Sequence, residues 1–303
     1  MHPFDHPSVS RLITTALEED LGRGDVTTLA TIPPDCAAQG KITAKAGLTI
    51  AGLPLVAMVL KMVDANAGVR LLKSEGSAVK KGEIIVELWG NAASLLIAER
   101  TLLNFLQRLS GVATLTRQFV EAIAGTKCKI IDTRKTLPGF RLLDKYAVTQ
   151  GGGMNHRMGL DDGVLIKDNH IAVCGGVGAA VRLARSRVSA LLRIEVECTT
   201  LAELQEAVDA QADIILLDNM STEQMREAVQ LVRGHALLEA SGNMSLARVR
   251  EVAETGVDFI SVGALTHSVA AVDLSMTVTT EVQNAKCKVQ SAESGACNHE
   301  RCC

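Results

Sequence analysis

The stretch I-I-L-L-D-N-M-S-T-E-Q-M-R-E-A-V-Q-L-V at residues 214–232 contains a short apolar run, a polar turn and a helical pattern, in that order. The run Ile214–Leu217 is typical of a buried strand, and Thr222–Val232 has apolar residues at helical spacing. A strand followed directly by a helix is the repeating unit of parallel α/β sheets. The stretch therefore predicts one such unit.

The same unit recurs from Lys127 onward. Further apolar runs occur at 129–131, 164–166, 192–196, 236–238 and 259–262, and further amphipathic stretches at 177–186, 201–210 and 246–255. Six units in succession favour an α/β barrel, complete or incomplete, over a Rossmann sheet. No G-x-G-x-x-G fingerprint opens a helix, which also argues against a dinucleotide-binding fold.

The first third of the chain reads as mixed α and β. Val9–Leu21 is predicted as a helix that ends at the turn Gly22–Asp25. Lys41–Ile50 and Gly82–Leu88 alternate apolar and polar residues, as half-buried strands do. The pattern from Ala92 to Val120 indicates one long helix or two helices separated at Ser110-Gly111.

Composition excludes several classes of protein. The chain is 47% hydrophobic and 21% charged, with a net charge of −3 and only 2% aromatic residues. Duplex DNA binding favours a basic excess, and single-strand binding favours aromatic platforms, so no nucleic-acid partner is expected. No apolar run is long enough to span a membrane, and no basic, apolar leader opens the chain, so we expect a cytoplasmic protein.

The eight cysteines fall into two groups. Those in the body of the chain are expected to be small buried hydrophobes: Cys36, Cys128, Cys174 and Cys198. The other four lie in the last seventeen residues: Cys287, Cys297, Cys302 and Cys303. We expect a flexible, dispensable tail there, with a metal or redox site as the alternative.

Polar groups follow each predicted strand of the second part, and in α/β barrels the carboxyl ends of the strands form the active site. Arg134 and Arg157 offer planar forks that match carboxylates. Glu197 and Asp218 suit Mg²⁺, or alternatively an ion-pair network with lysines. The turns at 241–243 and 263–264 are typical of phosphate sites or of ordinary loops.

The segment G-G-G-M-N-H-R at 151–157 is the least ordinary part of the sequence. Three consecutive glycines disfavour regular structure and let the backbone approach a ligand closely. His156 and Arg157 follow them directly, so this segment is a candidate for ligand binding, with a structural role for the histidine as the alternative.

Several long motifs in fixed order resemble the quinolinate phosphoribosyltransferase family. They are E-E-D-L-G-R-G-D-V-T-T at 18–28, E-R-T-L-L-N-F-L-Q-R-L-S-G at 99–111, D-T-R-K-T-L-P-G-F-R at 132–141, K-Y-A-V at 145–148, the glycine segment, L-I-K-D-N-H-I at 165–171, E-V-E at 195–197, L-L-D-N at 216–219, E-A-S-G-N at 239–243 and S-V-G-A-L-T-H-S at 261–268. The resemblance spans about residues 9–280.

This resemblance implies an N-terminal α/β sandwich domain (1–112) and an incomplete, open α/β barrel of about six parallel strands (113–270). A return segment (271–285) and the cysteine-rich tail (286–303) would follow. It also implies a homodimer, and a reaction of quinolinate with phosphoribosyl pyrophosphate (PRPP) that yields nicotinate mononucleotide, pyrophosphate and CO₂. That step feeds de novo NAD synthesis.

The resemblance also implies roles for individual residues. Quinolinate would be bound by Arg134, His156, Arg157 and Lys167, with Arg100 reaching in from the partner subunit. PRPP would be bound by Thr133, Lys135 and Lys167. Glu197 and Asp218 would position Mg²⁺ and the ribose hydroxyls and, with Lys135, would form the catalytic set. The 5′-phosphate would be held by Ser241, Gly242, Asn243, Val262, Gly263 and Ala264, with His267 close behind.

Two rival functions stay open. One is a phosphoribosyltransferase of the same fold with another acceptor, either nicotinate or the substrate of the paralogue associated with molybdate transport. An acceptor with one carboxylate would not need all of the cations Arg100, Arg134 and Arg157 together with His156. The other is a non-catalytic ligand-binding protein, which should lack at least one metal or phosphate residue; Glu197 and Asp218 are both present.

Overall fold

The computed structural model describes residues 3–280 and divides the chain into two compact units. The first unit comprises residues up to Ser110 together with the segment from Ala271 onward, and the second comprises Gly111–Ala270. The helix α4 (Ala92–Ala122) contains the boundary, so Ser110-Gly111 does not separate two helices. Within the first unit, the Ser110 hydroxyl instead accepts the backbone N–H of Ala51 at 3.1 Å.

The first unit is built on a four-stranded antiparallel sheet in the order β12-β1-β5-β3. Its other elements are helices and a short two-stranded sheet, β2 with β4. The bounds are α1 Pro7–Leu21, α2 Val26–Thr31, β1 Ala37–Ala44, β2 Leu48–Thr49, α3 Leu53–Val63, β3 Gly68–Leu71, β4 Ala78–Val79, β5 Ile84–Asn91 and β12 Leu274–Thr279. The chain therefore returns to the first unit after the second is complete.

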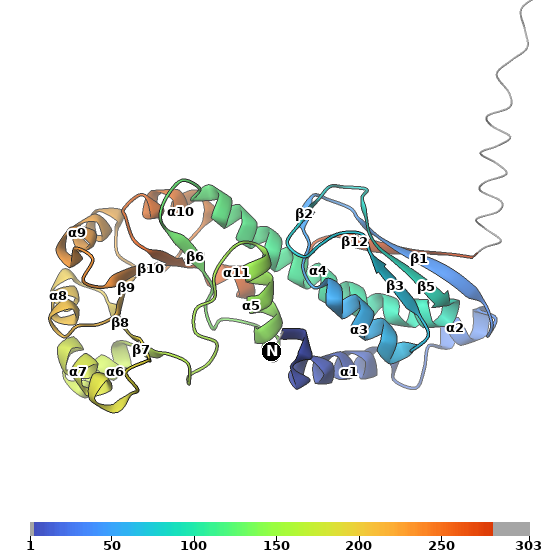
Figure 1. Ribbon diagram of the computed structural model, residues 1–303, viewed down its shortest axis with the longest axis horizontal. Helices are drawn as coiled ribbons and strands as arrows, with labels where there is room; N and C mark the ends of the chain where they lie inside the picture. The colour runs from blue at the N-terminus through green and yellow to red at the C-terminus, as the bar shows by residue number, and fades with distance from the viewer. Residues whose placement is uncertain (1–2, 281–303) are drawn as a thin grey trace, which may run out of the picture. The chain divides into compact units, whose positions relative to one another are not determined.

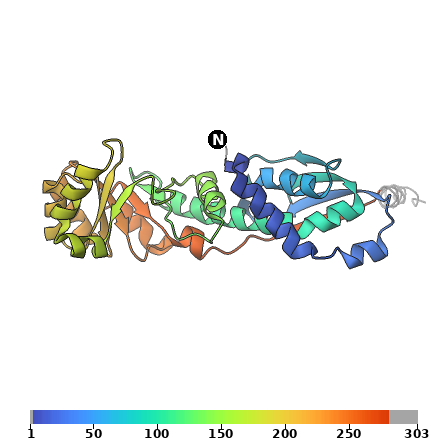
Figure 2. The same ribbon diagram turned by 90° about the horizontal axis from the view of Figure 1, so that it is seen from below.

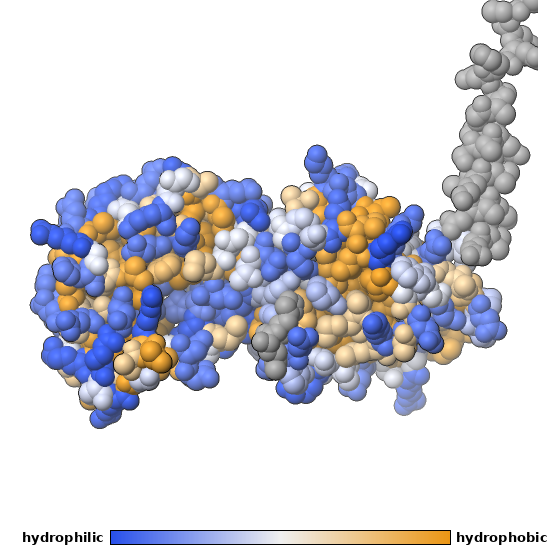
Figure 3. Space-filling view, viewed as in Figure 1, coloured by the Kyte–Doolittle hydropathy of each residue, from blue (hydrophilic) through white to orange (hydrophobic). Residues whose placement is uncertain are grey.

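The sequence did not predict α2, β3, β4 or β12, and two further differences have a clear physical reason. The predicted strand over Lys41–Ile50 is two strands, β1 and β2, because the chain bends at residues 45–47. The helix α3 was not predicted, because its run of apolar residues has no polar face to reveal a period; Leu55, Val56 and Val59 are all buried. Figure 3 shows apolar surface on this unit. On strands β5 and β3 of its sheet, Trp89 and Leu71 are 47% and 45% exposed.

The second unit contains six parallel strands in the order β6-β11-β10-β9-β8-β7. Helices α7 to α10 lie on the outer face of this curved sheet (Figures 1 and 2). The bounds are β6 Lys129–Ile131, α5 Arg141–Gln150, β7 Val164–Ile166, α6 Asp168–Cys174, α7 Val177–Arg187, β8 Ile194–Cys198, α8 Leu201–Asp209, β9 Ile214–Asp218, α9 Thr222–Val232, β10 Leu237–Ser241, α10 Leu246–Ala253, β11 Phe259–Ser261 and α11 Ala264–His267.

This order makes the second unit an open barrel. The strands β6 and β7 lie at opposite edges of the sheet, although a closed barrel would pair them. The prediction of an incomplete barrel with six parallel strands is confirmed. The core between this sheet and its covering helices includes Val196, Ile215 and Ile260, each 0% exposed, which fits an aromatic-poor core.

Two of the four body cysteines are buried, as expected. Cys128 is 3% exposed and Cys198 is fully buried, and burial raises the pKa of each thiol to about 12. Cys36 and Cys174 are partly exposed, so the prediction is wrong for these two. The cysteine-rich tail lies outside the described residues. Among residues 3–280, no helix combines the length and apolar character that crossing a bilayer requires.

Candidate active site

Two adjoining pockets lie at the carboxyl ends of the barrel strands. The acceptor pocket, of about 360 Å³, is lined by Thr133, Arg134, Lys135, His156, Arg157, Leu165, Lys167, Glu197, Leu216, Asp218, Glu239, Ser241 and Ser261. The phosphate pocket, of about 540 Å³, is lined by Thr133, Lys135, Asp218, Asn219, Ser241, Gly242, Asn243, Met244, Ser261, Gly263, Ala264 and His267. Five residues line both, so the two pockets form one continuous site: Thr133, Lys135, Asp218, Ser241 and Ser261.

The glycine segment enters this site as an added strand beside β6. Met154 forms a parallel bridge with Ile131, donating its N–H to the Ile130 carbonyl at 2.9 Å and accepting the Asp132 N–H at 3.1 Å. A Cβ on Gly151 would lie 2.6 Å from the Ala113 carbonyl oxygen, so only glycine allows the segment to pass so close to α4. This pairing occupies the open edge of the sheet and brings His156 and Arg157 into the acceptor pocket.

A buried ion pair holds the end of this segment. The Lys145 ammonium donates to Asp132, and both side chains are completely buried. Asp132 Oδ1 also accepts the His156 N–H at 2.9 Å, and the Lys145 ammonium donates to the His156 carbonyl at 2.9 Å. The backbone N–H and carbonyl of His156 are therefore both hydrogen bonded. These bonds hold the end of the segment in one position and so fix where the Arg157 side chain begins.

The acceptor pocket contains two guanidinium groups with unmet hydrogen-bonding capacity. The Nε atoms of Arg134 and Arg157 are buried and have no partner among the described residues. Burial and the neighbouring positive charge of Arg134 lower the pKa of Arg157. Buried N–H groups without acceptors are costly, and adjacent like charges repel, so an anion bound here would relieve both penalties.

The phosphate pocket is shaped by backbone that glycine permits. Gly242 and Asn243 both have positive φ, at 96° and 48°, and a Cβ on Gly242 would lie 2.1 Å from Asn219 Oδ1. Asn tolerates this conformation better than most residues, which explains how Asn243 occupies the turn. The Arg248 guanidinium donates to the carbonyls of Gly242 and Met220 and thereby fixes the turn.

Glu197 and Asp218 end neighbouring strands and both line the acceptor pocket. Glu197 lies 3.4 Å from the Lys167 ammonium, and Asp218 accepts a hydrogen bond from the Asn219 side chain at 2.8 Å. Both carboxylates are partly exposed. A pair of accessible carboxylates fits Mg²⁺, which prefers oxygen ligands and keeps several waters.

Arg100, which was expected to reach the site of a partner subunit, is an exposed residue of the first unit and lines neither pocket. Two other predicted site residues, Val262 and His156, do not sit as expected. Val262 is 1% exposed, and its N–H donates to the Ile131 carbonyl, so it is not free to bind phosphate.

His156 lines the acceptor pocket, but both of its ring nitrogens are engaged. Its Nδ1 accepts the Arg157 N–H at 2.7 Å, and its Nε2 lies 3.0 Å from Glu195 and 3.5 Å from Glu239. Direct binding of a carboxylate by His156 is therefore not the geometry observed.

Several site residues were not predicted. Asp132, Lys145, Asn219, Glu239 and Ser261 all contribute, and each lies inside a motif quoted above. A charged residue within an apolar strand, as in L-L-E-A-S at 237–241, is the available signal for Glu239. The charge on Lys145 gave no such signal, because a helical lysine is usually exposed.

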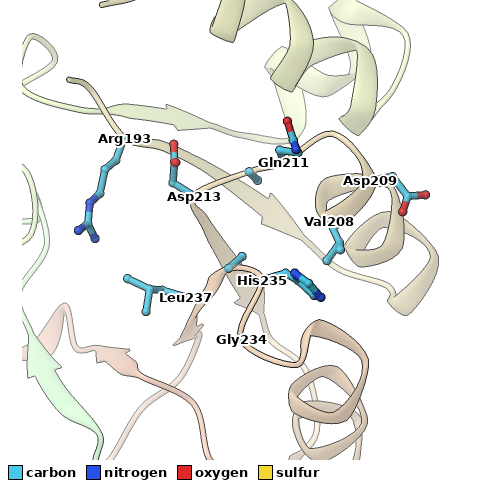
Figure 4. A pocket seen from close by; sticks show the side chains of 10 residues that line it. Arg193, Val208, Asp209, Gln211, Asp213, Gly234, His235 and Leu237 are labelled. Atoms are coloured by element: carbon cyan, nitrogen blue, oxygen red, sulfur yellow. The ribbon is translucent and has the colours of Figure 1, made fainter. Parts of the chain in front are cut away.

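A third pocket, of about 660 Å³, lies at the amino ends of the same strands (Figure 4). Its residues include Arg193, Asp213 and His235, and none of them is a predicted site residue. Asp213 already accepts the Ile194 N–H at 2.7 Å and pairs with Arg185 at 2.7 Å. This pocket is therefore large enough for a ligand, but none of its lining residues has a buried side-chain atom that lacks a hydrogen-bond partner.

Comparison with known proteins assigns both parts of the chain to one family. The model for the C-terminal domain of quinolinate phosphoribosyl transferase matches residues 112–277, and the model for the N-terminal domain matches residues 25–110. Together the two matches span nearly all of the residues that the structure describes.

Individual relatives carry consistent names. The chain is 43% identical to a probable nicotinate-nucleotide pyrophosphorylase [carboxylating] of Bacillus subtilis, over 91% of this chain and 95% of that protein. It is 45% identical to a protein of the same name from Synechocystis, over 86% and 90%. The solved nicotinate-nucleotide pyrophosphorylase of Francisella tularensis matches with a TM-score of 0.87 and 44% identity, over 90% and 96%.

Proposed function

The chain belongs to the quinolinate phosphoribosyltransferase family, and on that premise we propose that it transfers the phosphoribosyl group of PRPP to quinolinate. The acceptor is decarboxylated, so the products are nicotinate mononucleotide, pyrophosphate and CO₂. Several relatives are named as carboxylating or decarboxylating enzymes of this kind, which supports a place in de novo NAD synthesis.

One observation carries the choice of acceptor. Arg134 and Arg157 face one pocket with buried, unpartnered Nε groups, and their charges disfavour each other. A dicarboxylate supplies enough acceptors and enough negative charge for both guanidinium groups. A monocarboxylate such as nicotinate would leave one of them incompletely paired, which favours quinolinate over that rival.

The donor would occupy the adjoining phosphate pocket. Lys135 lines both pockets, and we assign it to the pyrophosphate with Thr133 and Lys167. The 5′-phosphate would lie against the turn Ser241–Asn243 and the Gly263-Ala264 backbone, with His267 at the edge. Val262 is not assigned to the phosphate, because its backbone N–H already donates to the Ile131 carbonyl.

We assign Glu197 and Asp218 to Mg²⁺ and the ribose hydroxyls. Mg²⁺ bound there would neutralise charge on the departing pyrophosphate. The two carboxylates would also stabilise the positive charge that develops on the ribose as the C1–oxygen bond breaks. Lys135 and Lys167 would offset the pyrophosphate charge from the protein side.

The order of bond changes follows from the acceptor's chemistry. The ring nitrogen of quinolinate attacks C1 of the ribose as pyrophosphate leaves, which makes the ring a pyridinium. The positively charged ring nitrogen then stabilises the electron pair that stays on the neighbouring ring carbon when its carboxylate departs as CO₂. Arg134 and Arg157 orient the ring during both steps and hold its carboxylates away from water.

We further propose a homodimer in which Arg100 of one subunit completes the acceptor pocket of its partner. Arg100 is exposed on α4 and lines neither pocket, so it is available to a second chain. The test is complementation between two variants, Arg100→Ala and Arg134→Ala, assayed at a quinolinate concentration too low for either variant alone to turn over at a measurable rate. In a mixed dimer one pocket has every residue intact, so random reassociation should restore about a quarter of wild-type activity. Absence of any recovery from a mixture shown to exchange subunits would contradict the shared site.

The decisive experiment measures CO₂ released from carboxyl-labelled quinolinate with purified protein, PRPP and Mg²⁺. Nicotinate is tested in parallel for nucleotide formation. CO₂ release that depends on PRPP and Mg²⁺ supports both reaction and metal. Nucleotide from nicotinate alone would overturn the acceptor, and inactivity with both would favour the molybdate-associated paralogue or a non-catalytic protein.

We also propose a cytoplasmic location. The free, partly exposed thiols of Cys36 and Cys174 suit a reducing compartment. Some plant relatives are named chloroplastic or mitochondrial, so fractionation of the native cell is the measurement that decides.

A further inference from the structure

The proposed reaction needs a proton that none of the residues assigned above supplies. When the ring carbon loses CO₂, the electron pair of the broken bond stays on that carbon. Nicotinate mononucleotide carries hydrogen there, so a proton must be delivered to this position. A proton donor should therefore line the acceptor pocket.

A buried cluster in this pocket is used by none of the steps above. Glu195 on β8, Glu239 on β10 and His156 bring ligating atoms within 4.8 Å of one another. The side chains of Glu195 and Glu239 are only 5% and 3% exposed. Of the two carboxyl groups, Glu239 is the one that lines the acceptor pocket.

The geometry of the cluster favours a proton on one carboxyl group. The Oε2 atoms of Glu195 and Glu239 both lie beside Nε2 of His156, at 3.0 and 3.5 Å, and two buried carboxylates this close together disfavour each other's charge. Burial, followed by the negative charge of Glu195, raises the pKa of Glu239 well above its usual value, although Ser261 and the charge of Lys167 act in the opposite direction.

His156 is poorly placed to deliver the proton itself. Because its Nδ1 accepts the Arg157 N–H, the ring carries its hydrogen on Nε2. That atom points at Glu195 and Glu239 rather than at a ligand. The other charged groups that line the pocket are Arg134, Lys135, Arg157, Lys167, Glu197 and Asp218. The guanidinium groups do not give up a proton at ordinary pH. The remaining groups have the roles proposed above toward pyrophosphate or metal.

We propose that Glu239 is the general acid of the decarboxylation: it holds a proton while the acceptor binds and gives it to the ring carbon that has lost CO₂. The electron pair left on that carbon takes the carboxyl proton, and Glu239 becomes a carboxylate. Solvent restores the proton after product release. This assignment rests on the proposed function.

Charge balance supports this timing. With Glu239 neutral, a dicarboxylate enters a pocket that contains one buried anion of the pair rather than two. During the reaction the ring gains a positive charge and loses a carboxylate. The new negative charge on Glu239 then stays beside a cationic ring, which offsets it.

The test is a single-turnover measurement that follows pyrophosphate and CO₂ separately in Glu239→Gln. We expect pyrophosphate release at close to the wild-type rate, with CO₂ release slowed about 100-fold, the lower range for loss of a general acid. The nucleotide that retains both carboxylates should accumulate. Glu227→Gln, an exposed substitution on α9, is the matched control and should behave as wild type.

A pH profile separates a proton donor from a structural group. Wild-type CO₂ release should fall as pH rises through the pKa of Glu239, and Glu239→Gln should lack that limb. Glu195→Gln removes the neighbouring charge, so it should move the limb to lower pH. This variant also serves if Glu239→Gln does not fold.

Three outcomes would overturn the assignment. They are equal pyrophosphate and CO₂ rates in Glu239→Gln, an equal loss of both with the alkaline limb intact, or a limb that does not move in Glu195→Gln. Wild-type protein that releases no CO₂ from quinolinate would instead overturn the proposed function. The two failures are therefore distinguishable.

Discussion

The two ends of the barrel strands present similar residues in different states. At the amino end, Lys127 pairs with Asp258 at 2.8 Å, with the lysine side chain 62% exposed. At the carboxyl end, Lys145 pairs with Asp132, and both are completely buried. The amino end also has the larger single pocket, about 660 Å³ against 540 and 360 Å³.

The difference shows that pocket size does not identify the site. At the amino end the central carboxylate, Asp213, has its partners within the protein. At the carboxyl end Arg134 and Arg157 have buried groups that lack partners. A buried polar group without a hydrogen-bond partner is costly in a folded protein. Such groups therefore mark the place where a ligand supplies the missing interaction.

The largest expected effect concerns the two Lys–Asp pairs. Lys145→Met should lower the free energy of unfolding by about 3–5 kcal/mol, because it leaves Asp132 buried without a counter-charge. Lys127→Met, the same change at the amino end, should cost less than about 1 kcal/mol. Urea denaturation of both variants measures the contrast. Equal losses would show that burial does not distinguish the two pairs.

The next effect concerns binding at the carboxyl end. Arg134→Ala should weaken quinolinate saturation by about 1.5–3 kcal/mol, as expected for a charge-assisted bidentate contact. Saturation by PRPP should change far less, because Arg134 lines only the acceptor pocket. Steady-state kinetics with each substrate varied in turn provide the measurement. A similar rise in both half-saturation values would contradict the division into two pockets.

A smaller effect is expected from the pocket at the amino end. Asp213→Ala removes the acceptor of the Ile194 N–H and the partner of Arg185, and should cost about 1 kcal/mol of stability. Turnover should be unchanged at temperatures where the variant is folded. Thermal unfolding and kcat measured together check this. A loss of turnover in the folded variant would give the amino-end pocket a functional role.

The smallest effect is a pH-dependent cap at the carboxyl end of β8, where α8 begins. Partial burial raises the pKa of Glu203, but hydrogen bonds from Thr199 and Thr200 outweigh it and hold the pKa below its usual value. A lowered folded-state pKa stabilises the protein above the unfolded value and is lost as pH falls through the folded value. Glu203→Gln should therefore cost less than about 1 kcal/mol at pH 7.

This difference should vanish at acid pH below the lowered pKa of folded Glu203, where the carboxyl is protonated in the folded protein as well as in the unfolded chain. Denaturation of wild type and Glu203→Gln at both pH values measures it, with Glu227→Gln as the control. A difference that grows toward acid would show that the sign is wrong.

Much of the barrel could be predicted because its signals are local. The helix at Thr222–Val232 and the strands at 129–131 and 164–166 occur at the predicted bounds, since each apolar run is followed by turn residues. Some helices were not predicted: α3 is apolar on most sides, and α5 and α6 lie in segments for which no element was predicted. The division of 41–50 into two strands depends on pairing with β5 and β4, which are distant in sequence.

The sequence by itself determined the fold class, the order of the polar groups along the strand ends and the family, because these depend on residue type and spacing. It also identified most residues of both pockets, from Thr133 to His267. The tertiary structure alone decided which groups are satisfied. Burial and hydrogen bonding depend on neighbours far apart in the chain. They pair the Val262 N–H with the Ile131 carbonyl, occupy both ring nitrogens of His156 and bring the buried side chains of Glu195 and Glu239 together.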